Sequence, residues 1–367
     1  MRTFTLTTHR VTVVAVPMLL AGMLGATAPS AAAATRSTGR AAVFTISGSL
    51  SGIAGTSARN AWAVGSIGTV RDSTLIVHWN GTSWRRVPNP TPSAGGFLNG
   101  VAATSAGNAW AVGGTSAGRT LILRWNGTTW KRVASPNPAG RAAFTSVAAT
   151  SARNAWAVGA TGGGKTLIAH WNGTAWSRVP SPSPGTFPDL TAVATSSGRN
   201  AWAVGDIGGF QTLTLRWNGR AWKRVASAGI PFGTSVSGVA TTSATAAWAV
   251  GCGCEGGADG AEIGHWNGSA WRHVPSPVRP VGSGLSGVAA SSARNVWAVG
   301  FTGATGPNPS PLILHWNGST WKRVPNPGPA GSMLHAVATS SARSAWALGS
   351  TRDNRSMILH WNGSTWR

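Results

Sequence analysis

Tyrosine is absent from this chain and acidic residues are scarce: seven Asp and Glu stand against 30 Lys and Arg, a formal net charge of +23. The absence of tyrosine excludes any enzyme whose nucleophile or metal ligand is a tyrosine side chain. Glycoside hydrolysis requires two carboxyl groups about 5–10 Å apart, and seven carboxylates allow few such pairs. The two cysteines cannot form a multi-disulfide framework. No long apolar run follows residue 34, so we expect no membrane span.

The first 34 residues have the features of an export signal. Arg2 and Arg10 form a basic region, residues 11–26 form an apolar region interrupted by Pro17, and residues 32–34 are three alanines typical of a cleavage site. We therefore predict a signal peptide at residues 1–34, one domain at residues 35–367, and a protein that is secreted or associated with the cell wall.

Tryptophan, in contrast, is abundant and regularly spaced. The 21 tryptophans form seven triplets that recur every 45 to 50 residues, a period typical of propellers and solenoids. One Trp of each triplet lies in Ala-Trp-Ala-Val-Gly or a near copy, and the other two flank an Asn-Gly pair. The three tryptophans therefore mark fixed positions within each repeat.

Each repeat contains four segments with the pattern of short strands. In the second repeat they occupy residues 98–104, 109–113, 120–125 and 130–133. Asn126-Gly127, between the last two, predicts a two-residue type I′ hairpin in which both residues have positive φ. Four antiparallel strands in each of seven repeats of about 48 residues predict an all-β, seven-bladed β-propeller. The two tryptophans that flank the turn are expected to stack.

These motifs resemble the kelch repeat of galactose-oxidase-type propellers, in which a Gly-Gly pair ends the second strand. Val112-Gly113-Gly114 matches that pair, whereas the other repeats have a single Gly, and Trp replaces the Tyr of the kelch pattern. The sequence is also similar to secreted Trp-rich propeller proteins of high-GC Gram-positive bacteria. The resemblance implies a fold and no activity, because galactose-oxidase and sialidase chemistry both need tyrosine.

The seventh repeat reaches Arg367 and lacks the residues that follow this position in the other repeats. Residues 42–46 have the pattern of a strand. They either complete the last blade or form a frayed N-terminal tail.

The repeats differ mainly in two kinds of segment, the loops between the second and third strands and the connections from the fourth strand to the next repeat. In a four-stranded blade both lie on the same face. Binding residues tend to lie on loops carried by a rigid scaffold, so this face is the candidate binding face, unless its loops vary only because nothing constrains them. The candidate ligand-binding residues are Arg71, Asp72, Arg119, Lys165, Asp206, Glu255, Asp259, Arg352 and Asp353.

The loop at residues 251–262 is the most unusual of these segments. It contains Cys252 and Cys254 together with Glu255, Asp259 and Glu262. Three interpretations stay open: a disulfide between the two cysteines, a cation site built from carboxylates and carbonyls, or a solvated insertion. We assign no metal site and no cofactor.

Two further patterns have structural explanations. Residues 159–166 match G-x-x-x-x-G-K-T, but a strand follows instead of the helix that a phosphate-binding loop requires, so we predict a hairpin. A His or Arg precedes the first Trp of each flanking pair, and we expect these side chains to pack beside Trp, because ligands on different blades cannot converge on one metal. They are His78, Arg124, His170, Arg216, His265, His315 and His360.

The sequence thus predicts an exported, monomeric, non-catalytic propeller that binds an extracellular glycan, an anionic envelope polymer or a protein through its varied face. The alternative is a secreted carbohydrate-active hydrolase or lyase with a site at the channel mouth. A lectin would expose a Trp in a shallow pocket on each blade, whereas a protein-binding propeller would have one continuous patch. Specific nucleic-acid binding is not expected, because no Lys/Arg cluster with exposed aromatic residues is present.

Overall fold

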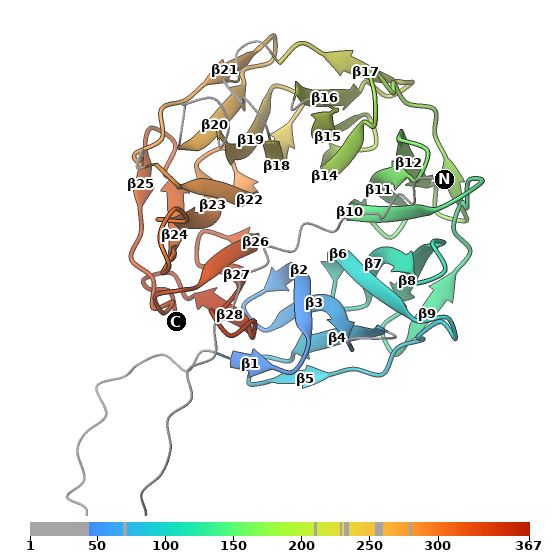
Figure 1. Cartoon of the computed structure of the whole chain (residues 1–367), viewed down its shortest axis with the longest axis horizontal. Coiled ribbons are helices and arrows are strands. Elements are labelled where there is room, and N and C mark those ends of the chain that lie inside the picture. The colour runs from blue at the N-terminus through green and yellow to red at the C-terminus, as the bar shows by residue number, and fades with distance from the viewer. Residues whose placement is uncertain are drawn as a thin grey trace, which may run out of the picture. The chain divides into compact units, whose positions relative to one another are not determined.

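A computed structural model describes residues 44–68, 72–208, 211–227, 230, 235–253, 260–278 and 281–367. Residues 42–367 form one compact unit, in which seven four-stranded antiparallel sheets, the blades, are arranged in a ring (Figure 1). The predicted seven-bladed β-propeller is confirmed. No helix in the part of the chain that the structure describes is long and apolar enough to cross a membrane. The predicted signal peptide at residues 1–34 lies outside the described residues.

In six blades the strands follow the chain from the centre of the ring outward, and the seventh blade takes its outer strand from the N-terminal segment. The innermost strands are β2 (Ser49–Ser57), β6 (Gly96–Ser105), β10 (Ala142–Ser151), β14 (Asp189–Ser197), β18 (Ser235–Ser243), β22 (Gly284–Ser292) and β26 (Met333–Ser341). The second strands are β3 (Asn60–Ile67), β7 (Asn108–Thr115), β11 (Asn154–Thr161), β15 (Asn200–Ile207), β19 (Ala246–Cys252), β23 (Asn295–Thr302) and β27 (Ser344–Ser350). The third strands are β4 (Ser73–Trp79), β8 (Thr120–Trp125), β12 (Lys165–Trp171), β16 (Gln211–Trp217), β20 (Ala261–Trp266), β24 (Ser310–Trp316) and β28 (Ser356–Trp361). The outer strands are β5 (Trp84–Arg86), β9 (Trp130–Val133), β13 (Trp176–Arg178), β17 (Trp222–Val225), β21 (Trp271–His273), β25 (Trp321–Arg323) and β1 (Phe44–Ile46).

A bulge in each innermost strand explains the glycine of Ala-Trp-Ala-Val-Gly. In blade 1 the pairing of β2 with β3 skips Ser51, and the same shift recurs in the other six blades. A Cβ atom on Gly65 would lie 1.9 Å from the carbonyl oxygen of Ser49, and the matching glycines of the other blades are equally crowded. Only glycine fits at this position, because a side chain would occupy the space of the neighbouring backbone.

The tryptophans connect neighbouring blades. Trp62 of blade 1 packs against Trp125 and Trp130 of blade 2, with ring centroids 4.9 and 5.2 Å away. The arrangement recurs at each boundary and closes the ring, where Trp346 of blade 7 lies 5.4 Å from Trp84 of blade 1. Trp125 and Trp130, which flank one turn, have centroids 6.0 Å apart but ring planes inclined at 45°, so they are in contact but the predicted stacking is not observed. Each cluster therefore combines one Trp of one blade with two of the next.

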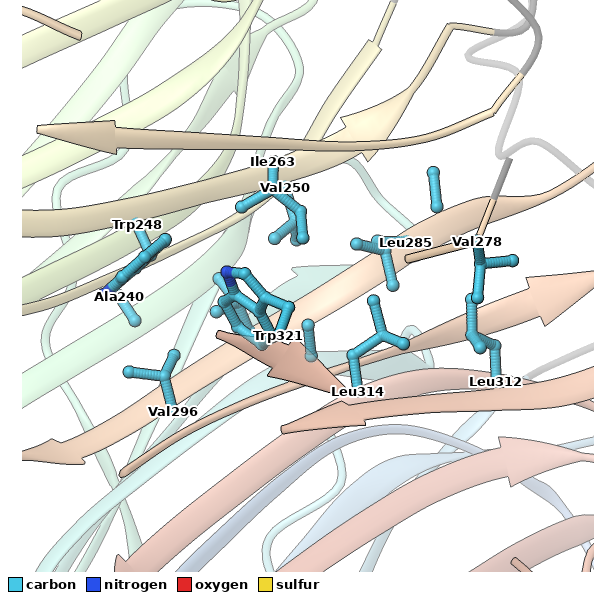
Figure 2. Close-up of a cluster of buried hydrophobic side chains, with 13 residues drawn as sticks. Ala240, Trp248, Val250, Ile263, Val278, Leu285, Val296, Leu312, Leu314 and Trp321 are labelled. Carbon is cyan, nitrogen blue, oxygen red and sulfur yellow. The ribbon is translucent and has the colours of Figure 1, made fainter. Parts of the chain in front are cut away.

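The hydrophobic core is correspondingly a ring of seven clusters, each shared by two adjacent blades. Figure 2 shows the cluster between blades 5 and 6, in which Trp248 of β19 and Trp321 of β25 lie among aliphatic side chains. These two rings meet edge to face at 5.2 Å, a geometry worth about 0.5–1.5 kcal/mol beyond the area it buries. Blade-to-blade packing therefore supplies most of the buried apolar surface.

The turn between the third and outer strands differs from the prediction. Gly127 has a φ of 102°, but Asn126 is not among the residues with positive φ. The Asn126 Oδ1 atom instead accepts hydrogen bonds from the backbone N–H groups of Thr128 and Thr129, at 3.0 and 2.9 Å. The type I′ prediction is wrong because this side chain caps a four-residue loop, and only the glycine needs the left-handed conformation.

The outer strand of blade 7 comes from two separate segments. Phe44 lies opposite Ile358 and Ile46 lies opposite Ser356, so β1 pairs with the first half of β28. The second half pairs with the last residues of the chain, because Arg367 and His360 exchange backbone hydrogen bonds of 2.9 and 3.0 Å. Of the two alternatives left open by the sequence, completion of the blade is the one observed.

Removing β1 should destabilise the ring, because half of the β28 edge would lose its partner. We expect a chain that begins at Ser47 to lose about 2–3 kcal/mol of unfolding free energy. A chain that begins at Ala42 should unfold like one that begins at Thr35. Denaturant unfolding followed by tryptophan fluorescence measures all three, and equal stability would contradict closure by β1.

Candidate functional site

The candidate site is the loop face, defined here as the loops between second and third strands together with the connectors from each outer strand to the next innermost strand. Backbone hydrogen bonds tie these segments to one another. The Gly96 N–H group donates to Asp72 O at 2.7 Å, and the Ser116 N–H group donates to Gly95 O at 3.2 Å. Further bonds of this kind join Ala142 to Gly118, Gly162 to Arg141, Gly208 to Thr186, Ala304 to Gly282 and Gly331 to Pro309. Backbone bonds do not depend on side-chain identity, so the sequence of this face can vary while its shape is held.

The predicted binding residues occupy several blades of this face. Arg71, Glu255, Asp259 and Cys254 lie outside the described residues, so the Cys252–Cys254 disulfide stays a prediction. Asp72, Arg119 and Lys165 lie at the starts of the third strands of blades 1, 2 and 3, Asp206 lies in β15, and Arg352 and Asp353 precede β28. Asp353 forms an exposed ion pair with Arg355 at 3.3 Å, and the Arg352 guanidinium donates a hydrogen bond to Asn308 Oδ1 at 3.1 Å. The described candidates are therefore spread over several blades of the ring instead of being gathered in one place.

One of these residues has a carboxylate partner that sequence reasoning missed. Asp206 lies directly opposite Asp189 in the pairing of β15 with β14, at the loop-face end of the innermost strand. Burial and the charge of Asp206 raise the pKa of Asp189 to about 6. A hydrolase or lyase, the alternative raised by the sequence, would need two carboxyl groups of this kind as acid and base. Only the register of the two strands, which includes a bulge, brings the carboxylates together.

A second feature that the sequence did not reveal is Phe187, in the connector between blades 3 and 4. Its side chain is 65 % exposed and its φ is 52°. Gly164, in the preceding loop, has a φ of 66°, and a Cβ atom there would lie 2.6 Å from the Phe187 ring. Positive φ is strained for a bulky residue, so the backbone at Phe187 is held in an unfavourable conformation while its ring faces solvent.

The loop at residues 159–166 is a hairpin, as predicted: β11 ends at Thr161 and β12 begins at Lys165.

The loop at residues 251–262 of blade 5 is described only at its two ends. At its C-terminal end, the Glu262 carboxylate pairs with the His273 imidazole at 2.9 Å. Within the described ranges, no group of three or more His, Cys, Asp or Glu side chains is placed to hold a metal ion.

The His and Arg residues that precede the third-strand tryptophans cover the buried Trp of the second strand. His78 stacks on Trp62 with centroids 4.1 Å apart, and its Nε2 atom lies 2.8 Å from Asn60 Oδ1. In blade 2 the Arg124 guanidinium takes the same place, 4.9 Å from the Trp110 ring. Burial lowers the pKa of five of these imidazoles, those of His78, His170, His265, His315 and His360. Packing beside Trp therefore accounts for this ring of side chains.

Most of the tryptophan side chains stabilise the fold by packing between neighbouring blades. Those of the second and outer strands are buried in all seven blades. Five of the seven third-strand tryptophans are partly exposed on the opposite face, where the Trp125 Nε1–H group, for example, donates to Ala106 O at 2.9 Å, whereas Trp171 and Trp266 are each 4 % exposed and therefore buried. The pattern expected of a lectin with one exposed Trp site on each blade is therefore not what this arrangement provides.

Comparison with known proteins agrees with the fold. No known family model matches the sequence, and no curated protein matches it. YCF48 from Cyanidioschyzon merolae is 18 % identical over 88 % of this chain and 99 % of its own, with a TM-score of 0.56. The BP39L lectin from Burkholderia pseudomallei is 14 % identical over 88 % of this chain and 98 % of its own (TM-score 0.59). A xyloglucanase from Xanthomonas campestris is 14 % identical over 87 % of this chain and 54 % of its own (TM-score 0.55). YCF48 has also been solved bound to a D1 peptide. At such identities the likeness shows a shared propeller fold.

The half-buried imidazoles beside the second-strand tryptophans predict acid sensitivity. A pKa below the ordinary 6.5 of histidine means that each contributes stability that is full above pH 6.5 and is lost as pH falls through the lowered value. We expect the melting temperature to fall from pH 7 to pH 5. Changing His78, His170 and His315 together to Arg, the residue used at Arg124, should flatten this dependence. Thermal unfolding across this range tests it, and an unchanged slope would contradict the assignment.

Asp189 predicts the opposite trend. Its pKa is raised from 3.8 to about 6, so its contribution is full below pH 3.8 and is lost as pH rises through 6. Asp189→Asn should therefore stabilise the protein by about 3 kcal/mol at pH 7.5 and by about 0.5 kcal/mol at pH 4. Asp353→Asn, in an exposed loop, is the control and should change stability little at either pH. A stability difference between Asp189→Asn and the parent that does not vary with pH would show that Asp189 is not a strained carboxylate.

Proposed function

We propose that this protein is an exported, non-catalytic binding protein that holds an anionic extracellular glycan or envelope polymer on its loop face. The observation that carries the proposal is Phe187, an exposed aromatic ring on a strained backbone beside the loop that leads to Lys165. Exposing such a ring does not stabilise the fold, and backbone strain of this kind concentrates at functional sites.

The chemistry of this region fits an acidic sugar. An aromatic face packs against the C–H groups of a sugar ring, and a neighbouring ammonium group attracts a charged substituent. Basic side chains are also exposed along the outer strands, and within the described residues only two ion pairs form, His273 with Glu262 and Arg355 with Asp353. Most of the basic side chains on the outer strands are therefore available to attract an anionic partner.

The structural neighbours are compatible with binding as the task of such a ring. They include a lectin, YCF48 bound to a peptide, and part of a mitotic checkpoint complex. A protein partner is the second candidate, and Val281 favours it: this side chain is 60 % exposed on the connector that leads to blade 6, a second apolar point on the same face.

The proposal predicts that Phe187→Gly weakens polymer binding about tenfold, the equivalent of about 1.4 kcal/mol, because the variant removes the ring that would pack against the sugar. Glycine tolerates a φ of 52°, so this variant removes the ring and relieves the strain. Binding to defined envelope polysaccharides would be measured at about 50 and 300 mM salt, the range over which the Debye length falls from about 14 to 6 Å.

The matched control is Arg220→Ala, which removes a charge from the exposed turn on the opposite face of blade 4. Binding should persist in part at the higher salt and should survive this change. Complete loss at high salt would mean attraction by charge alone. If no polysaccharide binds at either salt, the glycan proposal fails and a protein partner becomes the alternative to test.

A further inference from the structure

Blade 3 carries an open depression of about 450 Å³ at its rim, on the loop-face side. It is lined by Lys165, Thr166, Arg178, Pro180, Ser181 and Ser183. Lys165 and Thr166 are the first two residues of the third strand, β12, and Arg178 is the last residue of the outer strand, β13. Pro180, Ser181 and Ser183 belong to the connector that follows β13. Two cations and three hydroxyl groups thus meet in one hollow.

The two cations have no acidic partner there. Both side chains are exposed, and neither forms an ion pair within the described part of the chain. Arg178 lies opposite Ala169 in the pairing of β12 with β13, and Lys165 lies four residues before Ala169 on β12. Because residues two and four apart on a strand share a face, both cations project from the same side of blade 3.

The hydroxyl groups are held in a fixed order by Thr166, which is 3 % exposed. The Thr166 Oγ1–H group donates to Pro182 O at 3.1 Å, so the Ser181 hydroxyl donates to Thr166 Oγ1 at 2.9 Å. The Ser183 Oγ atom accepts from the Thr166 N–H group at 3.0 Å. Its own hydroxyl hydrogen has no acceptor among the described residues, so it is a positioned donor beside the two cations.

Other blades lack this combination. Blade 1 has Ser73 where blade 3 has Lys165. Blade 2 keeps two cations, Arg119 and Arg132, but Asn137 replaces Ser183; the Asn137 Oδ1 atom accepts from the Thr120 N–H group at 2.9 Å, and its amide donates to Ser135 O at 3.1 Å. Blade 3 therefore has a hydroxyl donor, that of Ser183, beside two cations, and blades 1 and 2 do not.

From this geometry we infer that blade 3 binds a phosphate or sulfate group carried by a glycan. Two cations and a hydroxyl donor supply three charge-assisted or neutral hydrogen-bond donors, which suit a tetrahedral oxyanion with three free oxygens better than a carboxylate with two. A hollow of 450 Å³ is larger than such an ion and lies in the range of small-molecule sites. The remaining space accepts the sugar, with the Pro180 ring as an apolar wall. The inference that the phosphate or sulfate is attached to a glycan rests on the proposed function. The inference that blade 3 binds a phosphate or sulfate group rests on the geometry of blade 3 alone.

The test is calorimetric titration of the purified protein with glucose 6-phosphate, N-acetylglucosamine 6-sulfate and glucuronic acid at about 50 mM salt. We expect one or both of the first two to bind, which distinguishes the phosphate source from the sulfate source. The carboxylate sugar should bind at least about tenfold more weakly. Lys165→Gln and Arg178→Gln should each weaken binding about tenfold or more, as loss of a charge-assisted hydrogen bond implies.

Two controls keep the result specific to this hollow. Arg86→Gln removes the cation at the matching position of the blade 1 outer strand and should change affinity less than twofold. Ser183→Asn keeps an acceptor for the Thr166 N–H group, as Asn137 does in blade 2, and should fold normally while binding more weakly.

Three results would overturn the inference: no binding of either ester, equal binding of glucuronic acid, or equal weakening by Arg86→Gln. Failure of the proposed function is a separate result. A protein that binds the esters through Lys165 and Arg178 but no envelope polysaccharide would retain the oxyanion site and lose the polymer-binding role. Polymer binding that depends on Phe187 but not on these cations would have the reverse meaning.

Discussion

The packing of one tryptophan into the tryptophan pair of the next blade is the interaction on which the rest of this structure depends. Trp62 contacts Trp125 and Trp130, and the same contact carries the ring through to Trp346 and Trp84. A four-stranded sheet cannot bury its faces alone, and each boundary here buries them against a neighbour. Closure is therefore a condition of stability, which is why β1 and Arg367 both contribute to the outer strand of blade 7.

Because strand side chains hold the blades together, most side chains of the loop face are not needed for stability. The core clusters hold the blades together through strand side chains, and the backbone bonds between adjacent loops, such as Gly96 to Asp72, need no particular side chain. The inner strands are fixed in turn by residues at the bulge: the Thr191 hydroxyl of blade 4 donates to Val236 O of blade 5 at 2.8 Å. Side chains on the loop face can therefore change without loss of the scaffold, which is the property that a binding surface requires.

Strand positions and blade number follow from the sequence because they depend on local period and on residue type. The Asn-Gly pairs correctly indicate a reversal of the chain, but the turn type does not follow, because Asn126 Oδ1 competes for the N–H groups of Thr128 and Thr129. The triplets are visible in the sequence, whereas their exchange between blades depends on how the blades pack. The Asp189–Asp206 pair depends on strand register, and the hollow in blade 3 depends on the path of a proline-rich connector; neither has a local sequence signal.

In a chain built from one repeated unit, the departures from the repeat carry the information about function. The repeated features, Trp, Gly and the capped turns, are accounted for by folding. Three departures lie in blades 3 and 4: the strained Phe187, the hollow that brings Lys165 and Ser183 together, and the raised pKa of Asp189 beside Asp206. The connector between these two blades supplies Phe187 and Ser183, and the strand that follows it begins with Asp189. A single connector therefore supplies departures from the repeat to two neighbouring blades, and changes confined to one such segment are enough to make one part of a repeated scaffold chemically different from the rest.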